Sequence, residues 1–286
     1  MSTSKAAEKG DKKYTFFSPR KQFFSFPPDV ISSMLKQPSS PNGLLKLYQT
    51  CKYFYSKKQI LIMSDSKFDR SSFYYGENNP KLLIGDFWDE NYSDVQHLLW
   101  HTDKLQILHY NDRYFEKPEY LEKNRIPKFY RCSIKELELY KTVLSVDDFL
   151  LITAEKQIQK FTIRHHSWIC YPDYSKVDIA EIFKFEVMPK LQFLTCYRDA
   201  TNCTNEIFEK LSKIHLQTKL SEFYIRFGNS IPKNEFKGEY LFEFIKNNAE
   251  QKKTTFVGFE AHSAKLQLFF DEIVKRWENE ILKLSD

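Results

Sequence analysis

The sequence predicts an α/β fold with parallel strands, preceded by a short helical segment. Apolar stretches typical of strands recur along the chain after residue 80, and helix-start signals lie between several of them. Two amphipathic stretches separated by a Pro/Ser loop come before them. Alternating strands and helices favour parallel pairing, because a parallel connection needs a crossover of about a dozen residues or more.

Composition is that of a globular chain and narrows the range of functions. The chain of 286 residues is 42 % apolar and 28 % charged, which disfavours a disordered protein. It contains only 7 glycines, so loops that bind phosphate through close backbone approach are not expected. A net charge of +5 and a pI of 8.7 describe a mildly basic surface without the concentrated charge of a nucleic-acid site.

The chain divides into four segments on composition and pattern. We expect a disordered basic tail at 1–22, a helical segment at 23–64, a polar linker at 65–80 and an α/β domain at 81–286. No apolar run approaches 18 residues, and the start lacks the apolar region of a secretion signal. Five cysteines without paired spacing are expected to be reduced and buried. We therefore expect a cytoplasmic or nuclear protein.

The helical segment is predicted from two amphipathic stretches. Pro27 and Pro28 precede "DVISSMLKQ", in which Asp29 falls in the first turn, where the helix dipole favours an anion. "PSSPNG" ends this helix, and "LLKLYQTCKYFYSKK" begins a second one with apolar residues at three- and four-residue steps. A pair this small packs either on the rest of the chain or on another protein.

Residues of about 24 to 64 resemble an F-box, through "FPPDV", a helix ending in "ML", and "LLKLYQTCKYF". That family docks on the adaptor subunit of a cullin-type ubiquitin ligase. The resemblance implies that this chain binds such an adaptor and that the docking residues are Pro27, Pro28, Val30, Ile31, Leu35, Leu44, Leu45, Leu47, Cys51, Lys52 and Phe54. The alternative is a helical hairpin that packs on the remainder of the chain.

The strand-like stretches of the α/β domain resemble irregular leucine-rich repeats. They begin at Lys81, Lys104, Ile134, Ile158, Lys190, Leu220 and Thr255. Several fit L-x-x-L-x-L, as in Ile134/Leu137/Leu139, and Met188/Leu191/Phe193 fits with its ends relaxed. Successive anchors are 32, 24, 30 and 32 residues apart, longer than the usual repeat of about 20–29 residues. The chain is similar to the F-box families expanded in nematodes, and the resemblance implies an α/β solenoid with parallel strands.

Helices are expected between these strands and at the end of the chain. Ser93, Ser145 and Thr204 are placed to cap helices that begin at "HLLW", "FLLITAEK" and "NEIFEKLSKIHL". The last stretch, "AKLQLFFDEIVKRWENEILKLSD", carries one apolar stripe. It either covers the open end of the repeats or binds a partner.

Strand alternation predicts which side chains face away from the helices and are therefore candidates for binding a protein substrate. These are Glu136, Glu138, Lys160, Thr162, Gln192, Glu222, Tyr224 and Arg226. Leu194 shares the outward phase with Gln192, although it is apolar.

No motif for catalysis, nucleotide or metal binding is present in the sequence. His97 and His101 are four apart, a spacing that clamps a metal on a helix, but no third ligand lies at a motif distance. His165 and His166 are adjacent at the end of a predicted strand, where neighbouring residues point to opposite faces, so the two are not expected to bind one ion together. We expect no cofactor, no metal and no catalytic residue. The alternatives to a ligase receptor are a repeat scaffold without a ubiquitin role and an enzyme of unrecognised type.

Overall fold

The computed structural model describes two compact units, which divide between Lys58 and Gln59. The described residues are 27–36, 38, 40–50, 54, 58, 60–69, 81–84, 87–89, 98–108, 129–197, 204–227, 237–251, 255–261 and 264–284. The expected tail at 1–22 lies outside them. None of the helices in these ranges is long and apolar enough to cross a membrane.

The first unit contains α1 (Pro28–Lys36) and α2 (Pro41–Thr50). The backbone N–H of Ile31 donates to the carbonyl of Pro27, and α1 begins at Pro28 as predicted. The Ser40 hydroxyl accepts from the N–H of Gly43, so α2 begins at Pro41, within the stretch that was predicted to be a loop before Leu44. The Lys58 ammonium donates to the carbonyl of Leu35 at 3.3 Å, near the end of α1, where a cation suits the helix dipole.

The second unit is a sheet of ten strands, mostly parallel. Its path runs β12-β11-β10-β8-β6-β4-β1-β2-β3, with β5 beside β4. The strands are β1 (Ile60–Asp69), β2 (Lys81–Ile84), β3 (Phe87–Asp89), β4 (Leu98–Leu108), β5 (Arg131–Cys132), β6 (Glu136–Tyr140), β8 (Lys160–Arg164), β10 (Phe193–Cys196), β11 (Glu222–Phe227) and β12 (Phe256–Ala261).

From β1 through β4 to β12, the spatial order of the parallel strands follows the chain without reversal. Among the strands in the described ranges, β2 and β3 alone run antiparallel to the strands beside them. Two short strands, β7 (Val143–Ser145) and β9 (Trp168–Cys170), pair in a separate parallel sheet. Among the described parallel strands the order does not reverse, so these strands form no switch point of the kind that holds ligands in doubly wound folds.

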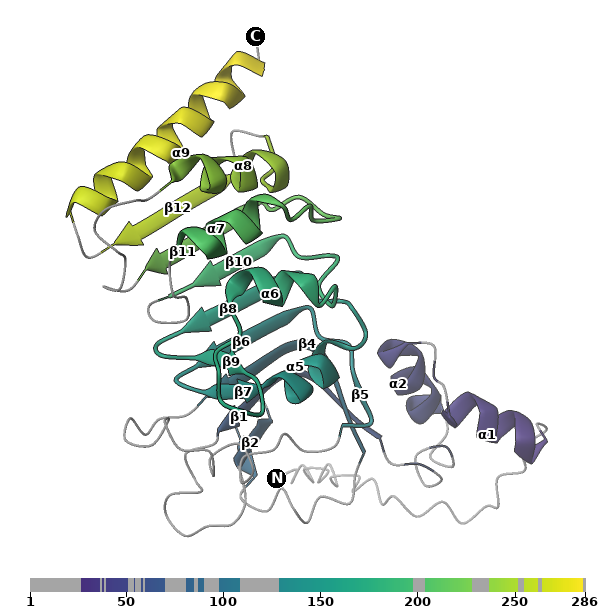
Figure 1. Cartoon of the computed structure of the whole chain (residues 1–286). Coiled ribbons are helices and arrows are strands. Elements are labelled where there is room, and N and C mark those ends of the chain that lie inside the picture. Colours follow the sequence, from purple (N-terminus) through teal and green to yellow (C-terminus); the bar gives the residue numbers. More distant parts are fainter. Residues whose placement is uncertain are drawn as a thin grey trace, which may run out of the picture. The chain divides into compact units, whose positions relative to one another are not determined.

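Helices connect the later strands and lie along one side of the sheet (Figure 1). They are α5 (Val146–Thr153), α6 (Ile179–Lys184), α7 (Asn205–Ser212), α8 (Gly238–Asn248) and the terminal α9 (Ala264–Leu284). Ser145 and Thr204 cap α5 and α7, each accepting from the backbone N–H three residues on, as predicted. Asp178 and Glu181 form a capping box at α6.

The core lies between the sheet and the helices and is built by a repeated pattern. Each of four repeats buries three apolar residues with the spacing L-x-x-L-x-L. They are Ile134/Leu137/Leu139, Ile158/Phe161/Ile163, Leu191/Leu194/Cys196 and Leu220/Phe223/Ile225. Phenylalanines link the layers: the ring of Phe223 lies 5.1 Å from that of Phe244 in α8 and 5.9 Å from that of Phe259 in β12. Such ring pairs stabilise the fold beyond what the burial of their apolar area contributes.

The structure corrects three predictions about the elements. "HLLW" does not begin a helix, because Leu98 to Trp100 belong to β4. Residues 60–69 form β1, although they were predicted as the end of the helical segment and the start of the linker. The boundary between the two units falls before this strand. In the third repeat, Leu194 rather than Leu191 aligns with Phe161 and Phe223, so the predicted repeat was displaced by three residues.

Candidate functional site

The face of the sheet opposite the helices carries rows of polar and aromatic side chains, and we call it the strand face. Because parallel partners in register point to the same side, the pairing fixes each row. The central row is Lys67, Gln106, Glu138, Thr162, Thr195, Tyr224 and Gly258, and the row toward the carboxyl ends of the strands holds Tyr140, Arg164, Arg226 and Glu260. The central row crosses seven neighbouring strands, from β1 to β12.

Glu138 joins three strands on this face. Its carboxylate accepts from the Gln106 amide at 2.6 Å and lies 3.2 Å from Nε of Arg164. Lys104 is a more distant ion partner at 3.8 Å. The side chain of Glu138 is only 16 % exposed, whereas that of Arg164 is 43 % exposed. The contacts therefore hold the Arg164 guanidinium in place while leaving much of it accessible.

Aromatic rings continue this chain of contacts across the sheet. The Arg164 guanidinium lies 5.5 Å from the ring centre of Tyr197, and Tyr197 lies 5.4 Å from Tyr224. The hydroxyl of Tyr224 donates to Glu260 at 2.5 Å, and Glu260 also pairs with Arg226 at 2.9 Å. Burial and the neighbouring Glu260 carboxylate both raise the pKa of Tyr224, so the phenol stays protonated and remains a donor.

Positive groups gather at the carboxyl ends of β6, β8 and β11. We call Lys141, Arg164, His165, His166 and Arg226 the cation cluster. Burial lowers the pKa of His165, and the positive charges of the other four members lower it further. His165 also lies 4.8 Å from the ring of Tyr140. At pH 7 the cluster therefore presents fixed arginine and lysine charges around a neutral imidazole.

Seven of the eight predicted substrate-binding residues lie on this face in the phase that alternation gave them. They are Glu136, Glu138, Lys160, Thr162, Glu222, Tyr224 and Arg226. Gln192 does not, because Phe193 and Thr195 pair with Lys160 and Thr162 and take the outward positions of β10. The apolar character of Leu194 was the signal that could have corrected the phase of this strand. Sequence reasoning also missed Tyr197, Glu260 and the turn residues of the cation cluster.

The predicted adaptor-binding residues separate into two groups in the first unit. Ile31, Leu35, Leu44 and Phe54 are buried, each 6 % exposed or less, and Leu47 is half-buried. Val30, Leu45 and both prolines are exposed, as is Met34, which the prediction did not include. Cys51 and Lys52 lie outside the described residues. The buried group holds the unit together, and the exposed group is the part that another molecule can reach.

Other chemistry-bearing residues do not converge in the described part of the chain. No group of three metal-ligating side chains is found there. His101 lies in β4 rather than on a helix and is buried against Ser66 at 2.7 Å, while His97 falls outside the described residues. His165 and His166 occupy a turn after β8 and not the strand itself. Cys132, Cys170 and Cys196 are buried, and burial raises the pKa of Cys132 and Cys196 to about 12, so these two stay thiols.

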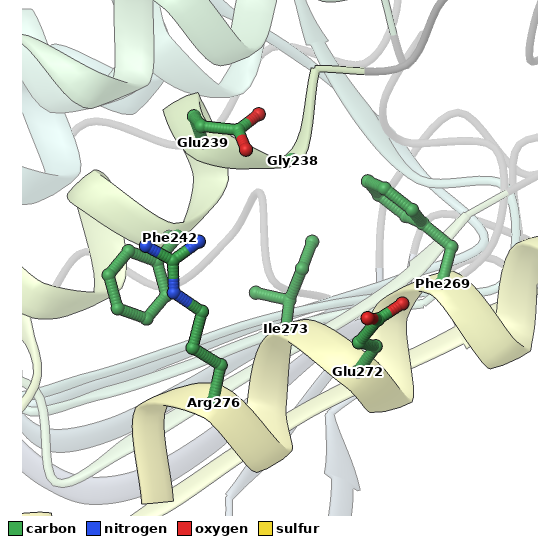
Figure 2. A pocket seen from close by; sticks show the side chains of 7 residues that line it. All are labelled: Gly238, Glu239, Phe242, Phe269, Glu272, Ile273 and Arg276. Carbon is green, nitrogen blue, oxygen red and sulfur yellow. The ribbon is translucent and has the colours of Figure 1, made fainter. Parts of the chain in front are cut away.

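A cavity of about 320 Å³ lies between α8 and α9 (Figure 2). Phe242, Phe269 and Ile273 line it, with the carboxylates of Glu239 and Glu272 at its rim. Both carboxylates are exposed, and the Arg276 guanidinium lies 4.1 Å from the ring centre of Phe242. A Cβ on Gly238 would lie 2.6 Å from Phe269 Cζ, so the glycine allows this close approach of the helices. These features describe packing between helices rather than a reaction site.

A comparison with known protein families found no family model that matches the chain, and a search of curated proteins found no matching relative.

Proposed function

We propose that the protein is a substrate receptor of a cullin-type ubiquitin ligase. The helical unit would dock on the adaptor subunit, and the strand unit, acting as an irregular repeat solenoid, would hold a protein substrate on its strand face. The role is positional: one body that binds both partners raises the effective concentration of the substrate near the ubiquitin donor. The proposal assigns no reaction to this chain.

The observation that carries the proposal is that some apolar residues of the first unit are buried while others are exposed. Ile31 and Leu35 are buried, whereas Val30 and Met34, one turn apart on α1, are each 39 % exposed. Leu45 of α2 is 41 % exposed. A unit this small gains little stability from exposed apolar side chains, and grouped exposed apolar residues are typical of a binding surface.

The strand face supports the second half of the proposal. Charged and aromatic side chains there contact one another from Gln106 of β4 to Glu260 of β12, as in the contacts of Glu138 and Tyr224. Arginine and tyrosine are enriched at the centres of protein interfaces, because each combines a large contact area with hydrogen-bonding groups. This composition fits a protein substrate better than a small molecule.

Capture of the purified adaptor by the full chain tests the docking half. The variant Val30→Asp/Met34→Asp should lose capture, because it places two charges on the exposed apolar surface without touching the buried residues. The control Ser33→Asp/Asn42→Asp adds the same charges at exposed polar positions and should retain capture. Undiminished capture by the first variant, with the circular dichroism spectrum unchanged, contradicts the docking surface.

The alternative is a repeat scaffold without a ubiquitin role. It shares the strand face, so substrate binding does not distinguish the two. Adaptor capture distinguishes them, because a scaffold without a ubiquitin role is not expected to bind a ligase subunit through the exposed apolar residues of α1. Failure of the wild-type chain to capture the adaptor would favour the scaffold.

A further inference from the structure

Asn42 and Gly43 form the one Asn-Gly pair in the sequence, and both residues are exposed in the first turn of α2. In such a pair the backbone nitrogen of the glycine attacks the asparagine side chain readily, because glycine places no Cβ beside the nitrogen. Among the described residues, no hydrogen bond engages the side-chain amide of Asn42. The pair therefore has the chemistry for loss of the amide, and the local structure determines how fast this happens.

The reaction uses water and no other reagent. The backbone nitrogen of Gly43 loses its proton and forms a bond to Cγ of Asn42, which closes a cyclic imide. The bond between Cγ and Nδ2 of Asn42 breaks, and Nδ2 leaves as ammonia, taking up a proton. Water then opens the ring at one of its two carbonyls. One opening leaves aspartate, and the other leaves isoaspartate, in which the backbone runs through Cβ and Cγ.

The start of α2 restrains this attack through the Gly43 nitrogen. The first N–H groups of a helix have no carbonyl partner within the helix. The Gly43 N–H donates instead to the Ser40 hydroxyl at 3.0 Å, and the described residues supply no other acceptor for it. Ring closure also requires Asn42 to leave the helical backbone conformation, because the ring eclipses Cβ and the Gly43 nitrogen about the Cα–C bond. The attack therefore requires the first turn to open, and one side-chain hydrogen bond opposes that opening.

We propose that Asn42 is a site of spontaneous deamidation and that the Ser40 cap sets its rate. A serine cap stabilises the start of a helix, and helix ends open far more often than the whole protein unfolds. The rate of conversion follows the fraction of time for which the first turn is open. The reaction requires no partner, so the site is independent of the proposed docking on an adaptor.

The two products differ in their effect on the helical unit. Aspartate keeps the backbone unchanged and places an anion in the first turn, where the helix dipole favours it. Isoaspartate lengthens the backbone between Ser40 and Leu44, whose carbonyl and N–H are joined at 3.1 Å. Leu44 is 1 % exposed, so a longer backbone displaces a buried residue. Isoaspartate should therefore loosen the unit, whereas aspartate should not.

Incubation of the full chain at mildly alkaline pH, followed by peptide mapping with mass spectrometry, tests the site. Asn42 should convert to aspartate and isoaspartate ahead of Asn205 and Asn247, each of which precedes a residue with a side chain. Gly43→Ala should prevent the conversion over the same period, because its Cβ crowds the attacking nitrogen. An unconverted Asn42 overturns the inference, as does equal conversion at Asn205 or Asn247.

Matched serine variants test the cap. Ser40→Ala should raise the rate of conversion about fivefold, the factor expected when a typical cap is lost. Ser40→Thr keeps a capping hydroxyl and should restore the slow rate. Ser33→Ala removes a hydroxyl from an exposed position on α1 and should leave the rate unchanged. Equal rates in Ser40→Ala and the wild type overturn control by the cap.

Limited proteolysis separates the effects of the two products. Asn42→Asp reproduces the aspartate product and should resist cleavage as the wild type does. A fraction enriched in isoaspartate should be cleaved faster before residue 59, in the helical unit. Equal resistance of the two would overturn the predicted loosening of the unit by isoaspartate.

Discussion

His101 makes the stability of the sheet depend on pH. Its ring is fully buried in β4, with Nδ1 2.7 Å from Ser66 Oγ and its edge against Phe129 at 4.4 Å. Nε2 has no hydrogen-bond partner, so a proton there would be a charge enclosed in an apolar site. Burial accordingly lowers the pKa of His101 to about 4, against 6.5 for an exposed imidazole.

We predict that His101 destabilises the protein progressively as pH falls from about 6.5 to about 4. In this window the unfolded chain binds a proton that the folded chain does not, so the free energy of unfolding rises with pH, and the full difference is about 3 kcal/mol. Chemical denaturation at several pH values measures it. His101→Asn should flatten this part of the profile, while His215→Asn, at an exposed position, should not. An identical slope in His101→Asn and the wild type contradicts the assignment.

Asn248, at the end of α8, is a second buried polar group, and its amide is fully used. Its Oδ1 accepts from the N–H of Leu216 at 2.7 Å, and its Nδ2 donates to the carbonyls of Ile214 and Phe244. The side chain thereby provides hydrogen-bond partners for two backbone groups of the loop after α7, the N–H of Leu216 and the carbonyl of Ile214. In the sequence it is one of two adjacent asparagines at a helix end, which does not reveal which amide is buried.

Asn248→Ala should lower the free energy of unfolding by about 2 kcal/mol, because Leu216 N–H and Ile214 C=O lose their partner inside the protein. The neighbouring substitution Asn247→Ala removes the same amide from a half-buried position and should cost much less. Urea unfolding of the three proteins compares them. Equal losses at the two positions would show that the amide network has no special role.

At the scale of elements, α9 protects the edge of the sheet. The N–H of Phe256 donates to Ser221, so by alternation the backbone groups of residues 256, 258 and 260 face β11 and those of 257 and 259 face the outer edge. Gln267 in the first turns of α9 donates to the carbonyl of Phe259 at 2.9 Å. An uncovered edge strand invites pairing with another chain, and the glutamine occupies one of its acceptors.

We expect Gln267→Ala to increase self-association, since it exposes the Phe259 carbonyl at the edge of β12. Light scattering over a concentration series measures the average mass. Gln251→Ala, which removes the same side-chain type at an exposed position before β12, serves as control and should stay at the wild-type mass. A monomer at every concentration for Gln267→Ala would mean that other parts of α9 suffice to protect the edge.

The elements also show what the sequence could specify. Polar side chains alternating with apolar ones predicted β6, β8 and β11 in the correct phase, because apolar residues such as Leu137, Phe161 and Phe223 occupy the positions of these strands that face the core. Prediction failed where alternation is broken. Leu98 to Trp100 are three consecutive apolar residues, which periodicity alone does not distinguish as helix or strand. In β10, Phe193 is apolar but outward, so the phase was taken from the wrong residues.

The candidate site was only partly foreseeable for a related reason. Residues within strands, such as Arg226, were found from the strand period, but Lys141, His165 and His166 lie in turns after β6 and β8. Lys141 and His165 are distant in sequence and approach because β6 and β8 pair side by side. A single sequence contains the strand pattern but not which turns become neighbours.

At the scale of the whole molecule, the two units should respond separately to damage. We predict that Leu35→Asp unfolds the helical unit and abolishes adaptor capture while leaving the strand unit folded. Leu35 is 5 % exposed, and a buried carboxylate without a partner costs several kcal/mol, which a unit this small does not withstand.

Limited proteolysis followed by mass spectrometry tests this prediction. Cleavage in Leu35→Asp should fall before residue 59 and leave a resistant fragment containing the strands, whereas the volume-conserving Leu35→Met should resemble the wild type. Loss of the strand fragment in Leu35→Asp would show that the two units unfold as one. Since Leu35 is buried, charge substitution there tests folding, whereas substitution of exposed residues such as Val30 and Met34 tests docking directly.

The backbone at His165 and His166 determines which substitutions would be enriched under selection for stability. His165 and His166 both have positive φ, 47° and 59°, a conformation that costs a non-glycine residue about 1 kcal/mol or more. Glycine at either position would relieve this strain but remove an imidazole from beside Arg164. Mutants enriched in a screen for heat resistance alone should therefore accumulate glycine at this turn, and each such substitution would remove an imidazole that neighbours Arg164.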